Sequence, residues 1–273
     1  MNIGIYYNDD NSQSVSAIEE FKRLLNEEKI HFIDLEETSP IDKKEINADL
    51  IVVFGGDGSV LTASKITLDK IPLVAINTGT IGFLTSYEIN QLSSLVEAIK
   101  TNTLEFSERR LLSIEYNGST CYALNDAVIM KDFQKDNYSC CIKLNLTIDG
   151  KRVDKYLADG LILSTPTGST AYALSAGAPV VTPDLEAIVV APICAHSLQS
   201  RPIVFSPKST AEVTVDEKSR PCALYVDGAP IRTLNGGETL TINLSNKIVK
   251  ICDNHCNFFE KLGKKISSWS NNG

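Results

Sequence analysis

The chain has 273 residues, of which 43% are hydrophobic and 22% charged, and its formal net charge is −8. This composition is typical of a globular protein with one large or two medium domains, and it excludes a fibre or a largely disordered chain. The acidic balance and the lack of a basic run argue against nucleic acid as a partner.

The sequence predicts a cytoplasmic protein with no membrane partner. The longest apolar stretch, residues 187–195, is too short to cross a bilayer, and the first ten residues lack the features of a signal peptide. Seven cysteines, an odd number, fit reduced thiols better than a disulfide framework. Residues 252–256, CDNHC, could suggest zinc, but a structural site needs four ligands and the sequence has no second cluster. We therefore expect no metal held by protein ligands alone.

The first hundred residues alternate short apolar runs with amphipathic segments. The apolar runs predict strands at residues 3–7, 31–35, 48–54 and 72–76. Helices are predicted at residues 16–29, with Ser16 and Glu19 as a capping box, and at residues 89–100. Continuous Val and Ile runs suit strands buried on both faces. We expect residues 1–100 to form an α/β domain with an open, mostly parallel, Rossmann-like sheet.

From residue 101 onward the pattern changes to short β-rich segments separated by turns. An Asn-Gly pair at residues 117–118 and an Asp-Gly pair at 149–150 each separate two alternating runs, as hairpin turns do. Later segments, TLTINL and IVKIC among them, are predicted as further separate strands. We expect residues 101–254 to form an antiparallel, sandwich-like β domain, and residues 255–273 to form a helix that returns to the first domain.

A glycine-rich turn, GGDG, joins the predicted strand at 48–54 to a helix. Gly55, Gly56 and Gly58 allow a ligand to approach the backbone at the carboxyl end of the strand, where open α/β sheets bind ligands. Asp57 is unexpected here, because its negative charge would repel a phosphate cradled by backbone N–H groups. The alternative interpretation is a tight turn in which Asp57 only caps the helix.

Other glycine-rich motifs do not fit this turn. Walker A ends in Lys followed by Ser or Thr, whereas this helix opens Ser59-Val60-Leu61, with Ser59 predicted as its cap. The dinucleotide fingerprint needs a small residue where Leu61 stands. Phosphoryl transfer does need a carboxylate beside a phosphate cradle, because Asp57 can accept the proton of the attacking hydroxyl or help to hold magnesium.

A second polar segment, STPTGSTAYALSAG, follows a predicted strand at residues 161–164. Hydroxyl and N–H groups gather there at the start of a short helix, predicted from Ala171 to about Ala176 and ended by Gly177, which favours polar ligand groups or phosphate. The alternative is a helix cap with spare hydroxyls. For Tyr172 the sequence alone favours a core position over a stacking one.

Several motifs together resemble one family. GGDG after a buried strand resembles NAD kinases, diacylglycerol-type lipid kinases and, more distantly, phosphofructokinases. The lipid kinases continue with Gly-Thr-Gly-Asn-Asp, whereas INTGTIGFL at residues 76–84 resembles the NAD kinase version. Residues 124–130, 159–179 and 191–207 resemble further NAD kinase motifs. The resemblance covers the chain from residue 48 to about residue 230.

The resemblance implies a role for each matching residue. Asp57 would be the catalytic base on the 2′-hydroxyl of the adenosine ribose of NAD. Cofactor- and substrate-binding roles would fall on Gly55, Gly56 and Gly58 at the donor phosphates, Phe83 at the adenine, Asn125 and Asp126 at the ribose and diphosphate, Asp159 near the nicotinamide, and Thr167, Thr170, Ala171, Tyr172 and Ser175 along the pocket. Asp126 replaces a Glu common in relatives, which alters reach but not acceptor chemistry.

The resemblance also implies substrates and assembly. The chain would phosphorylate NAD to NADP with ATP or polyphosphate as donor, a divalent metal such as Mg²⁺ arriving with the donor, in a homodimer or homotetramer. The alternatives are a lipid or sugar kinase of the same superfamily and a non-catalytic dinucleotide-binding protein. His196 is expected to be structural or interfacial. Arg109, Arg110 and Arg201 are either a phosphate clamp or salt-bridge partners, the second being favoured.

Overall fold

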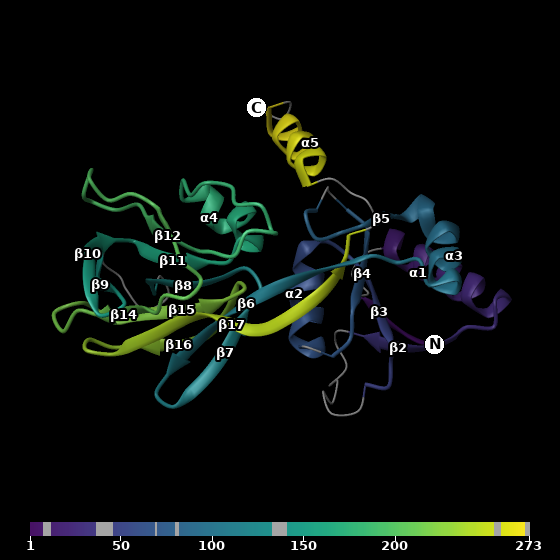
Figure 1. Ribbon diagram of the computed structural model, residues 1–273, viewed down its shortest axis with the longest axis horizontal. Coiled ribbons are helices and arrows are strands. Elements are labelled where there is room, and N and C mark those ends of the chain that lie inside the picture. Colours follow the sequence, from purple (N-terminus) through teal and green to yellow (C-terminus); the bar gives the residue numbers. More distant parts are fainter. Residues whose placement is uncertain are drawn as a thin grey trace. The chain divides into compact units, whose positions relative to one another are not determined.

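The computed structural model describes residues 1–7, 12–36, 46–68, 70–79, 82–132, 141–253 and 258–270. The chain divides into two compact units, shown in Figure 1. The α/β unit comprises Met1–Arg109 and Ile248–Gly273, and the β-rich unit comprises Arg110–Lys247. The chain therefore passes between the units twice, within strands β6 (Phe106–Tyr116) and β17 (Thr239–Cys252). The division falls inside these strands rather than at the predicted boundaries, because both strands are continuous.

The α/β unit is built on a parallel sheet with the strand order β2-β1-β3-β4. Its strands are β1 (Asn2–Tyr7), β2 (His31–Glu36), β3 (Leu50–Phe54), β4 (Leu73–Asn77) and the short β5 (Tyr87–Glu88), which pairs with β4. Every residue of β3 and β4 is buried, as their continuous apolar runs predict. The Rossmann-like α/β prediction is confirmed.

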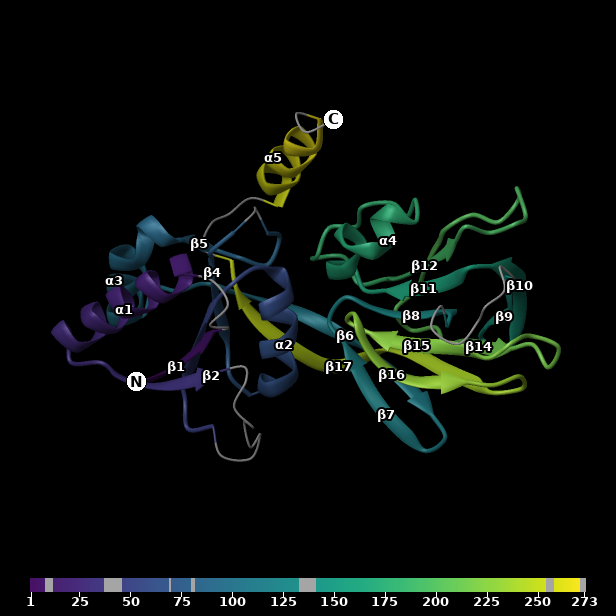
Figure 2. The same ribbon diagram turned by 180° about the vertical axis from the view of Figure 1, so that it is seen from behind.

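Helices cover both faces of this sheet. Helices α1 (Ser12–Glu27) and α3 (Leu92–Thr101) pack on one face and α2 (Asp57–Thr67) on the other, as Figures 1 and 2 show. The predicted capping box at Ser16 is wrong, because α1 begins at Ser12 and Ser16 lies inside the helix. Ser14 is buried, so the earlier turn packs into the core. Residues Ile89–Gln91 form a 3₁₀ turn before α3.

The β-rich unit is an antiparallel sandwich, which confirms the second part of the predicted fold. One sheet contains β6, β7 (Ser119–Ala123), β9 (Ile142–Ile148), β10 (Lys151–Ala158), β14 (Ala211–Val215) and the first part of β17. The other has the order β13 (Ile203–Phe205), β12 (Ile188–Ile193), β11 (Gly160–Ser164), β8 (Asp126–Lys131), β15 (Cys222–Val226) and β16 (Ala229–Leu234). Buried aliphatic side chains from both sheets form one core between them.

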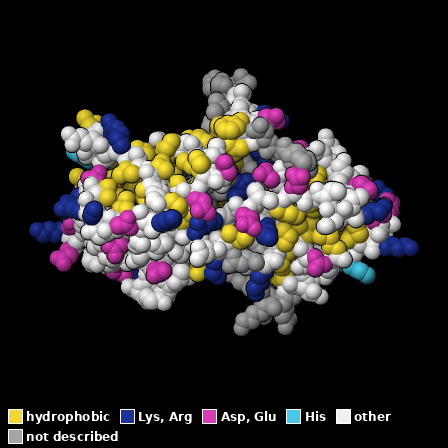
Figure 3. Space-filling view, in the orientation of Figure 1, with side chains coloured by type: hydrophobic (Ala, Val, Ile, Leu, Met, Phe, Trp, Pro, Cys, Tyr) yellow, Lys and Arg dark blue, Asp and Glu magenta, His cyan; other side chains and the backbone are white. Residues whose placement is uncertain are grey.

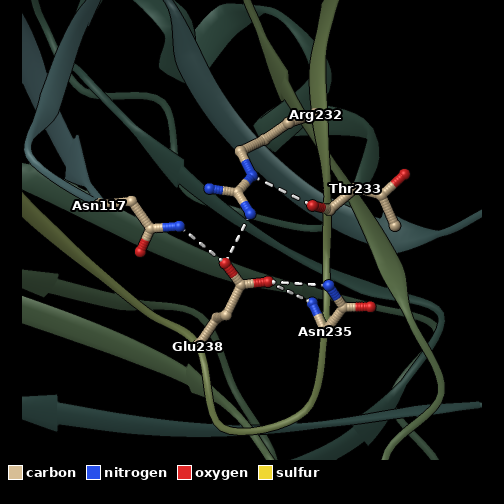
Figure 4. Close-up of polar contacts among 5 residues, drawn as sticks. All are labelled: Asn117, Arg232, Thr233, Asn235 and Glu238. Carbon is tan, nitrogen blue, oxygen red and sulfur yellow. Dashed lines mark hydrogen bonds and ion pairs between the residues drawn. The ribbon is translucent and has the colours of Figure 1, made fainter.

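Tight turns connect the hairpins of this unit. Asn117 and Gly118 have φ of 47° and 75°, and Asp149 and Gly150 have φ of 50° and 71°, the left-handed conformations that Asn-Gly and Asp-Gly turns supply. One end of the sandwich is fixed by Glu238, whose carboxylate accepts hydrogen bonds from Asn117, Arg232 and Asn235 (Figure 4).

Two features near the C-terminal end complete the fold. Segments 239–244 and 248–252, predicted as separate strands, are both parts of β17, because Arg110 on β6 donates hydrogen bonds to the carbonyls of Leu244 and Ser245 across the supposed break. Helix α5 (Phe258–Ser270) returns to the α/β unit as predicted. Within the described ranges, no helix has the length and apolar character needed to span a membrane.

Candidate functional site

The GGDG turn leads directly from β3 into α2. Gly56 is the N-cap of α2, in extended conformation with φ −97° and ψ −166°, and Asp57 is the first residue of the helix. The prediction that Ser59 caps the helix is therefore wrong: Ser59 already lies in the first helical turn. The alternative that Asp57 only caps the helix is not supported either, because no side chain makes a capping hydrogen bond at this end.

The carboxylate of Asp57 is held by a loop that follows 26 residues later in the chain. Its two oxygens accept hydrogen bonds from the backbone N–H groups of Phe83, at 3.0 Å, and Leu84, at 2.9 Å. The Nζ atom of Lys265 lies 3.8 Å from Oδ2, and the Asp57 side chain keeps 30% of its surface exposed. The carboxylate is thus fixed in direction and still reachable by a ligand, as a proton acceptor must be.

Glycines around this carboxylate have two different roles. A Cβ at Gly82 would collide with the carboxylate of Asp57, and a Cβ at Gly55 would collide with the side chain of Ser59. These two positions therefore need glycine for packing. By contrast, nothing lies within 4 Å of a Cβ built at Gly56 or Gly58, so the backbone there is open to an approaching ligand.

Phe83 is partly buried against helix α5. Its ring lies 5.9 Å from the ring of Phe258, and the ammonium of Lys265 lies 4.7 Å from its ring centroid. Lys261 donates hydrogen bonds to the carbonyl oxygens of Phe83, at 3.3 Å, and Thr85, at 2.8 Å. The loop that holds Asp57 is thus itself held by α5.

The other candidate residues lie in the β-rich unit, at one end of the paired strands β8 and β11. Asp126 opens β8 and faces Ser164, the last residue of β11. The carboxylate of Asp227 accepts hydrogen bonds from the backbone N–H groups of Leu124, Asn125 and Asp126. Asp227 is therefore the residue that shapes the turn into β8. The sequence does not reveal this role, because the three N–H groups lie more than 100 residues earlier.

Asn125 and Asp126 are both more than nine-tenths buried. The side-chain oxygen of Asn125 is buried and accepts no hydrogen bond within the described part of the chain. Burial, and secondly the charge of Asp227, raise the pKa of Asp126 to about 7. A buried amide oxygen and a carboxyl that is readily protonated are what polar groups of a ligand, such as ribose hydroxyls, can satisfy.

The segment after β11 is held mainly by its own hydroxyl groups. Thr165 donates to the carbonyl of Leu124 at 2.6 Å, and Ser169 bridges Pro166 and Val181. Residues Thr167–Thr170 form a 3₁₀ turn and Tyr172–Ser175 form α4, with Gly177 at φ 81° as the predicted stop. The hydroxyls of Thr165, Ser169 and Thr170 are therefore engaged in fixing the turn. The N-cap residues of the 3₁₀ turn and of α4 make no side-chain capping hydrogen bond, so the alternative of a helix cap with spare hydroxyls is not supported.

Asp159 and Tyr172 share one electrostatic environment. Asp159 pairs with Lys131 at 2.6 Å. Tyr172 is 40% exposed, so the core position favoured by the sequence alone is wrong. Partial burial raises the pKa of Tyr172, and the acidic groups of Cys194, Asp126 and Asp159 add to this rise. Tyr172, Asp126 and Asp159 therefore lie in one region of the β-rich unit, next to the half-exposed Ala171 and the exposed Ser175.

The arginines considered as a phosphate clamp have structural partners instead. Arg109 pairs with Asp253 at 3.6 Å, Arg110 pairs with Glu186 at 2.8 Å, and Arg201 donates to nearby backbone carbonyls. His196 is exposed, and its backbone N–H bonds to the carbonyl of Leu157. Cys140 and most of the CDNHC segment lie outside the described residues, and the five described cysteines form no disulfide.

The structure thus groups the candidate residues into two sets. Asp57, Phe83 and the three glycines belong to the α/β unit, and the remaining candidates belong to the β-rich unit. Sequence reasoning missed Gly82, Asp227, Lys131, Lys261 and Lys265. No local pattern marks these residues, since each acts on a partner far away in the sequence. Among the described residues, no group of three His, Cys, Asp or Glu side chains lies close enough to hold a metal ion.

Comparison with known proteins identifies relatives of this chain. Residues 36–103 match the model of the ATP-NAD kinase N-terminal domain, and residues 124–253 match that of the ATP-NAD kinase C-terminal domain. The chain is 34% identical over 272 residues to an NAD kinase of Petrotoga mobilis, covering 97% of each chain. It is 37% identical to an NAD kinase of Methanocorpusculum labreanum over 82% of this chain and 80% of the relative.

Solved structures agree with the sequence comparison. An NAD kinase from Archaeoglobus fulgidus, in complex with ATP, superposes with a TM-score of 0.81 at 26% identity, covering 97% of this chain and 98% of that one. A yeast NADH kinase complexed with NADH gives a TM-score of 0.86 over 98% of this chain and 87% of that one. At 23% identity this second likeness shows the shared fold alone.

Proposed function

The chain belongs to the NAD kinase family, and we propose that it transfers the γ-phosphoryl group of ATP to the 2′-hydroxyl of the adenosine ribose of NAD, yielding NADP and ADP. The observation that carries this proposal beyond the family is the fixed carboxylate of Asp57. It stands at the carboxyl end of β3 and is oriented by two backbone N–H groups, next to glycines that leave the backbone open.

Asp57 is the general base of the proposed reaction. The 2′-hydroxyl oxygen attacks the γ-phosphorus while its proton passes to the carboxylate of Asp57. The bond from the γ-phosphorus to the bridging oxygen breaks, and its electron pair leaves with ADP. The hydrogen bonds from Phe83 and Leu84 keep the carboxylate in place during this transfer, so that little reorganisation is needed.

The β-rich unit supplies the proposed acceptor site for NAD. Asn125 and Asp126 present buried oxygen atoms to the ribose and diphosphate region, and Asp227 fixes the backbone from which both side chains extend. Tyr172 is exposed enough to stack on a flat ring, and Thr167, Thr170, Ala171 and Ser175 adjoin it in the same segment. Asp159, paired with Lys131, would serve the nicotinamide end.

A divalent cation, Mg²⁺ above all, is the proposed cofactor, carried in by the phosphates of the donor. Magnesium in kinases is commonly bound by one or two carboxylates together with substrate phosphates, so a dedicated protein cage is not required. Among the residues that the structure describes in the α/β unit, Asp57 would contribute a carboxylate oxygen to the cation, because 30% of its side chain stays exposed beside the open glycines. When bound, the cation neutralises negative charge on the transferred group.

The protein is also proposed to assemble as a homodimer or homotetramer and to reside in the cytoplasm. Support for assembly comes from large apolar side chains on the surface of the β-rich unit: Val153, Leu157, Leu185, Leu198, Val204 and Ile231. Figure 3 shows hydrophobic side chains gathered on the face that carries β11, β12 and α4. Burial of these apolar side chains against a second copy of the chain would be more favourable than leaving them exposed to water.

The test is a product analysis of the purified protein incubated with NAD, ATP and Mg²⁺. Phosphorus NMR identifies the phosphorylated position. Parallel reactions test polyphosphate as the donor in place of ATP, and NADH, diacylglycerol or fructose 6-phosphate as the acceptor in place of NAD. A further reaction contains EDTA. NADP as the product, lost in EDTA, is expected. A 3′-phosphate, or faster phosphorylation of the lipid or the sugar, would contradict the proposal. NAD binding without any turnover would instead favour a non-catalytic dinucleotide-binding protein.

A further inference from the structure

Helix α5 presents one face to the loop that holds Asp57. Phe258, Lys261 and Lys265 follow one another at three- and four-residue spacing, which places them on the same side of a helix. Phe258 packs its ring on Phe83, and Lys261 bonds to the carbonyl oxygens of Phe83 and Thr85. This face of α5 is therefore docked on residues 82–85.

The loop at residues 82–85 makes hydrogen bonds both to Asp57 and to helix α5. Its N–H groups at Phe83 and Leu84 donate to Asp57, while its carbonyl groups at Phe83 and Thr85 accept from Lys261. Lys261 is therefore a positioning residue, since it reaches the catalytic carboxylate only through the loop. The docking of Lys261 also places Lys265, one helical turn later, on the side of α5 that faces this loop.

Lys265 itself reaches the carboxylate. Its ammonium lies 3.8 Å from Oδ2 of Asp57 and 4.7 Å from the centroid of the Phe83 ring, and its side chain is only 23% exposed. A largely shielded ammonium is costly without compensating charge, and the carboxylate and the ring face together supply it. The side chain of Lys265 therefore ends beside the proposed base.

We propose that Lys265 is a catalytic residue that contacts the transferred phosphoryl group. This inference rests on the proposed function. The attacking hydroxyl must lie about 3 Å from Asp57 and the phosphorus about 3 Å further, so phosphoryl oxygens come within reach of an ammonium beside Asp57. The flexible stem of Lys265 lets its charge move from Asp57 to these oxygens as the donor binds. The proton of the attacking hydroxyl still passes to Asp57.

This assignment supplies a cation that the GGDG turn lacks. In a Walker site a lysine on the phosphate loop itself contacts the β- and γ-phosphates. Here the turn carries no lysine, and the charge comes instead from a helix 208 positions later in the chain, the difference between 265 and 57. Cations preorganised at a developing charge stabilise a transition state more than a ground state.

Steady-state kinetics of Lys265→Met and Lys265→Gln test this role. Both replacements remove the charge. Met keeps a stem of about the same length, and the shorter Gln keeps a polar head in case Met disturbs folding. We expect kcat to fall by about 100- to 1,000-fold, as for loss of a transition-state donor, with the KM for NAD changed by less than about threefold. Lys265→Arg, which restores the charge, should recover part of kcat.

Lys264→Met is the matched control, because Lys264 is the neighbouring lysine of α5 and is exposed. It should leave kcat and the melting temperature unchanged. A second readout separates chemistry from folding: ethylammonium added to Lys265→Ala should restore part of kcat, while leaving Asp57→Asn unaffected. If folded Lys265→Met and Lys265→Gln turn over as fast as the parent, the proposal for Lys265 fails alone. A parent protein that makes no NADP overturns the proposed function as well.

Discussion

The carboxylate of Asp227 accepts a hydrogen bond of 2.7 Å from the backbone N–H of Asn125, 102 residues earlier in the chain. The same carboxylate accepts from Leu124 and Asp126. One side chain therefore fixes three consecutive N–H groups and also places its negative charge beside the buried Asp126.

Replacing Asp227 by Asn should weaken both the fold and the acceptor site. Asn tolerates the φ of 48° at this position but has one acceptor oxygen in place of two, so at least one partly buried N–H loses its partner. We expect the free energy of unfolding to fall by about 1–3 kcal/mol and the KM for NAD to rise several-fold. Denaturant unfolding and steady-state kinetics measure these changes. Asp149→Asn, at φ 50° in a distant turn, is the control and should leave KM alone.

The raised pKa of Asp126 predicts two opposite pH dependences. Its pKa of about 7 lies above the usual value, so folding favours the protonated form. The protonated Asp126 carboxyl contributes fully to the free energy of unfolding below about pH 4, and this contribution is lost as the pH rises to about 7. NAD binding should improve over the upper part of this range, because the ionised carboxylate is the stronger acceptor for ribose hydroxyls. Unfolding and NAD titrations from pH 5 to 8 measure both. The dependences should vanish in Asp126→Asn, and their persistence there would assign them to another group.

Asp57→Asn should remove most turnover and leave NAD affinity within a few-fold. The amide cannot accept the proton, and loss of a general base typically costs about 100- to 10,000-fold in rate. Its NH₂ group would also face one of the two N–H groups that Asp57 now accepts, which loosens the loop at Phe83 and Leu84. The measurements are kcat and a calorimetric NAD titration. Near-normal turnover would remove Asp57 from the role of base.

Gly82→Ala should act on turnover through Asp57. The added methyl would meet the carboxylate directly and lie 3.1 Å from the hydroxyl oxygen of Thr85. We expect kcat to fall by about 10- to 100-fold, because displacement of a catalytic group by about 1 Å can cost this much. Gly79→Ala, where the methyl meets nothing within 4 Å, is the matched control. Equal kcat in the two variants would show that the loop yields without moving Asp57.

Light scattering at micromolar concentration tests the proposed assembly. We expect a mass of two or four times the 29.8 kDa of one chain. Leu198→Glu and Leu157→Glu, at side chains that are 88% and 38% exposed, should lower this mass if the apolar surface is the contact. A mass near 29.8 kDa for the unaltered protein would contradict assembly.

The fold could be predicted from the sequence to the extent that local patterns determine it. Residues 50–54 and 73–76 are predicted as buried strands because every side chain is apolar, and Asn117-Gly118 is predicted as a turn because both residues tolerate positive φ. Element boundaries were less predictable. Ser16 resembles a cap, but the helix continues upstream because an earlier turn is buried. The break predicted at 245–247 is absent because β17 is one continuous strand paired with β6, and Arg110 of β6 also binds the carbonyls of Leu244 and Ser245.

The candidate site was only partly predictable for the same reason. Asp57 stands out in the sequence because its charge conflicts with a glycine-rich turn. The partners that orient it, Phe83, Leu84 and Lys265, carry no such mark, since a backbone N–H or a helical lysine is common anywhere. Asp227 likewise carries no mark in the sequence, because the three N–H groups that it binds lie more than 100 residues earlier. Hydrogen bonds between residues far apart in the sequence can be identified only once the fold is known.

The α/β unit takes its residues from both ends of the chain. The first 247 residues contain the GGDG turn and the polar segment after β11, but not the end of β17 that pairs with Leu73, nor α5. The loop at residues 82–85 then lacks its contacts with Lys261, and Asp57 lacks Lys265. A chain that stops after residue 247 should therefore carry GGDG intact and still lack the helix that holds the Asp57 loop, so we expect it to be inactive.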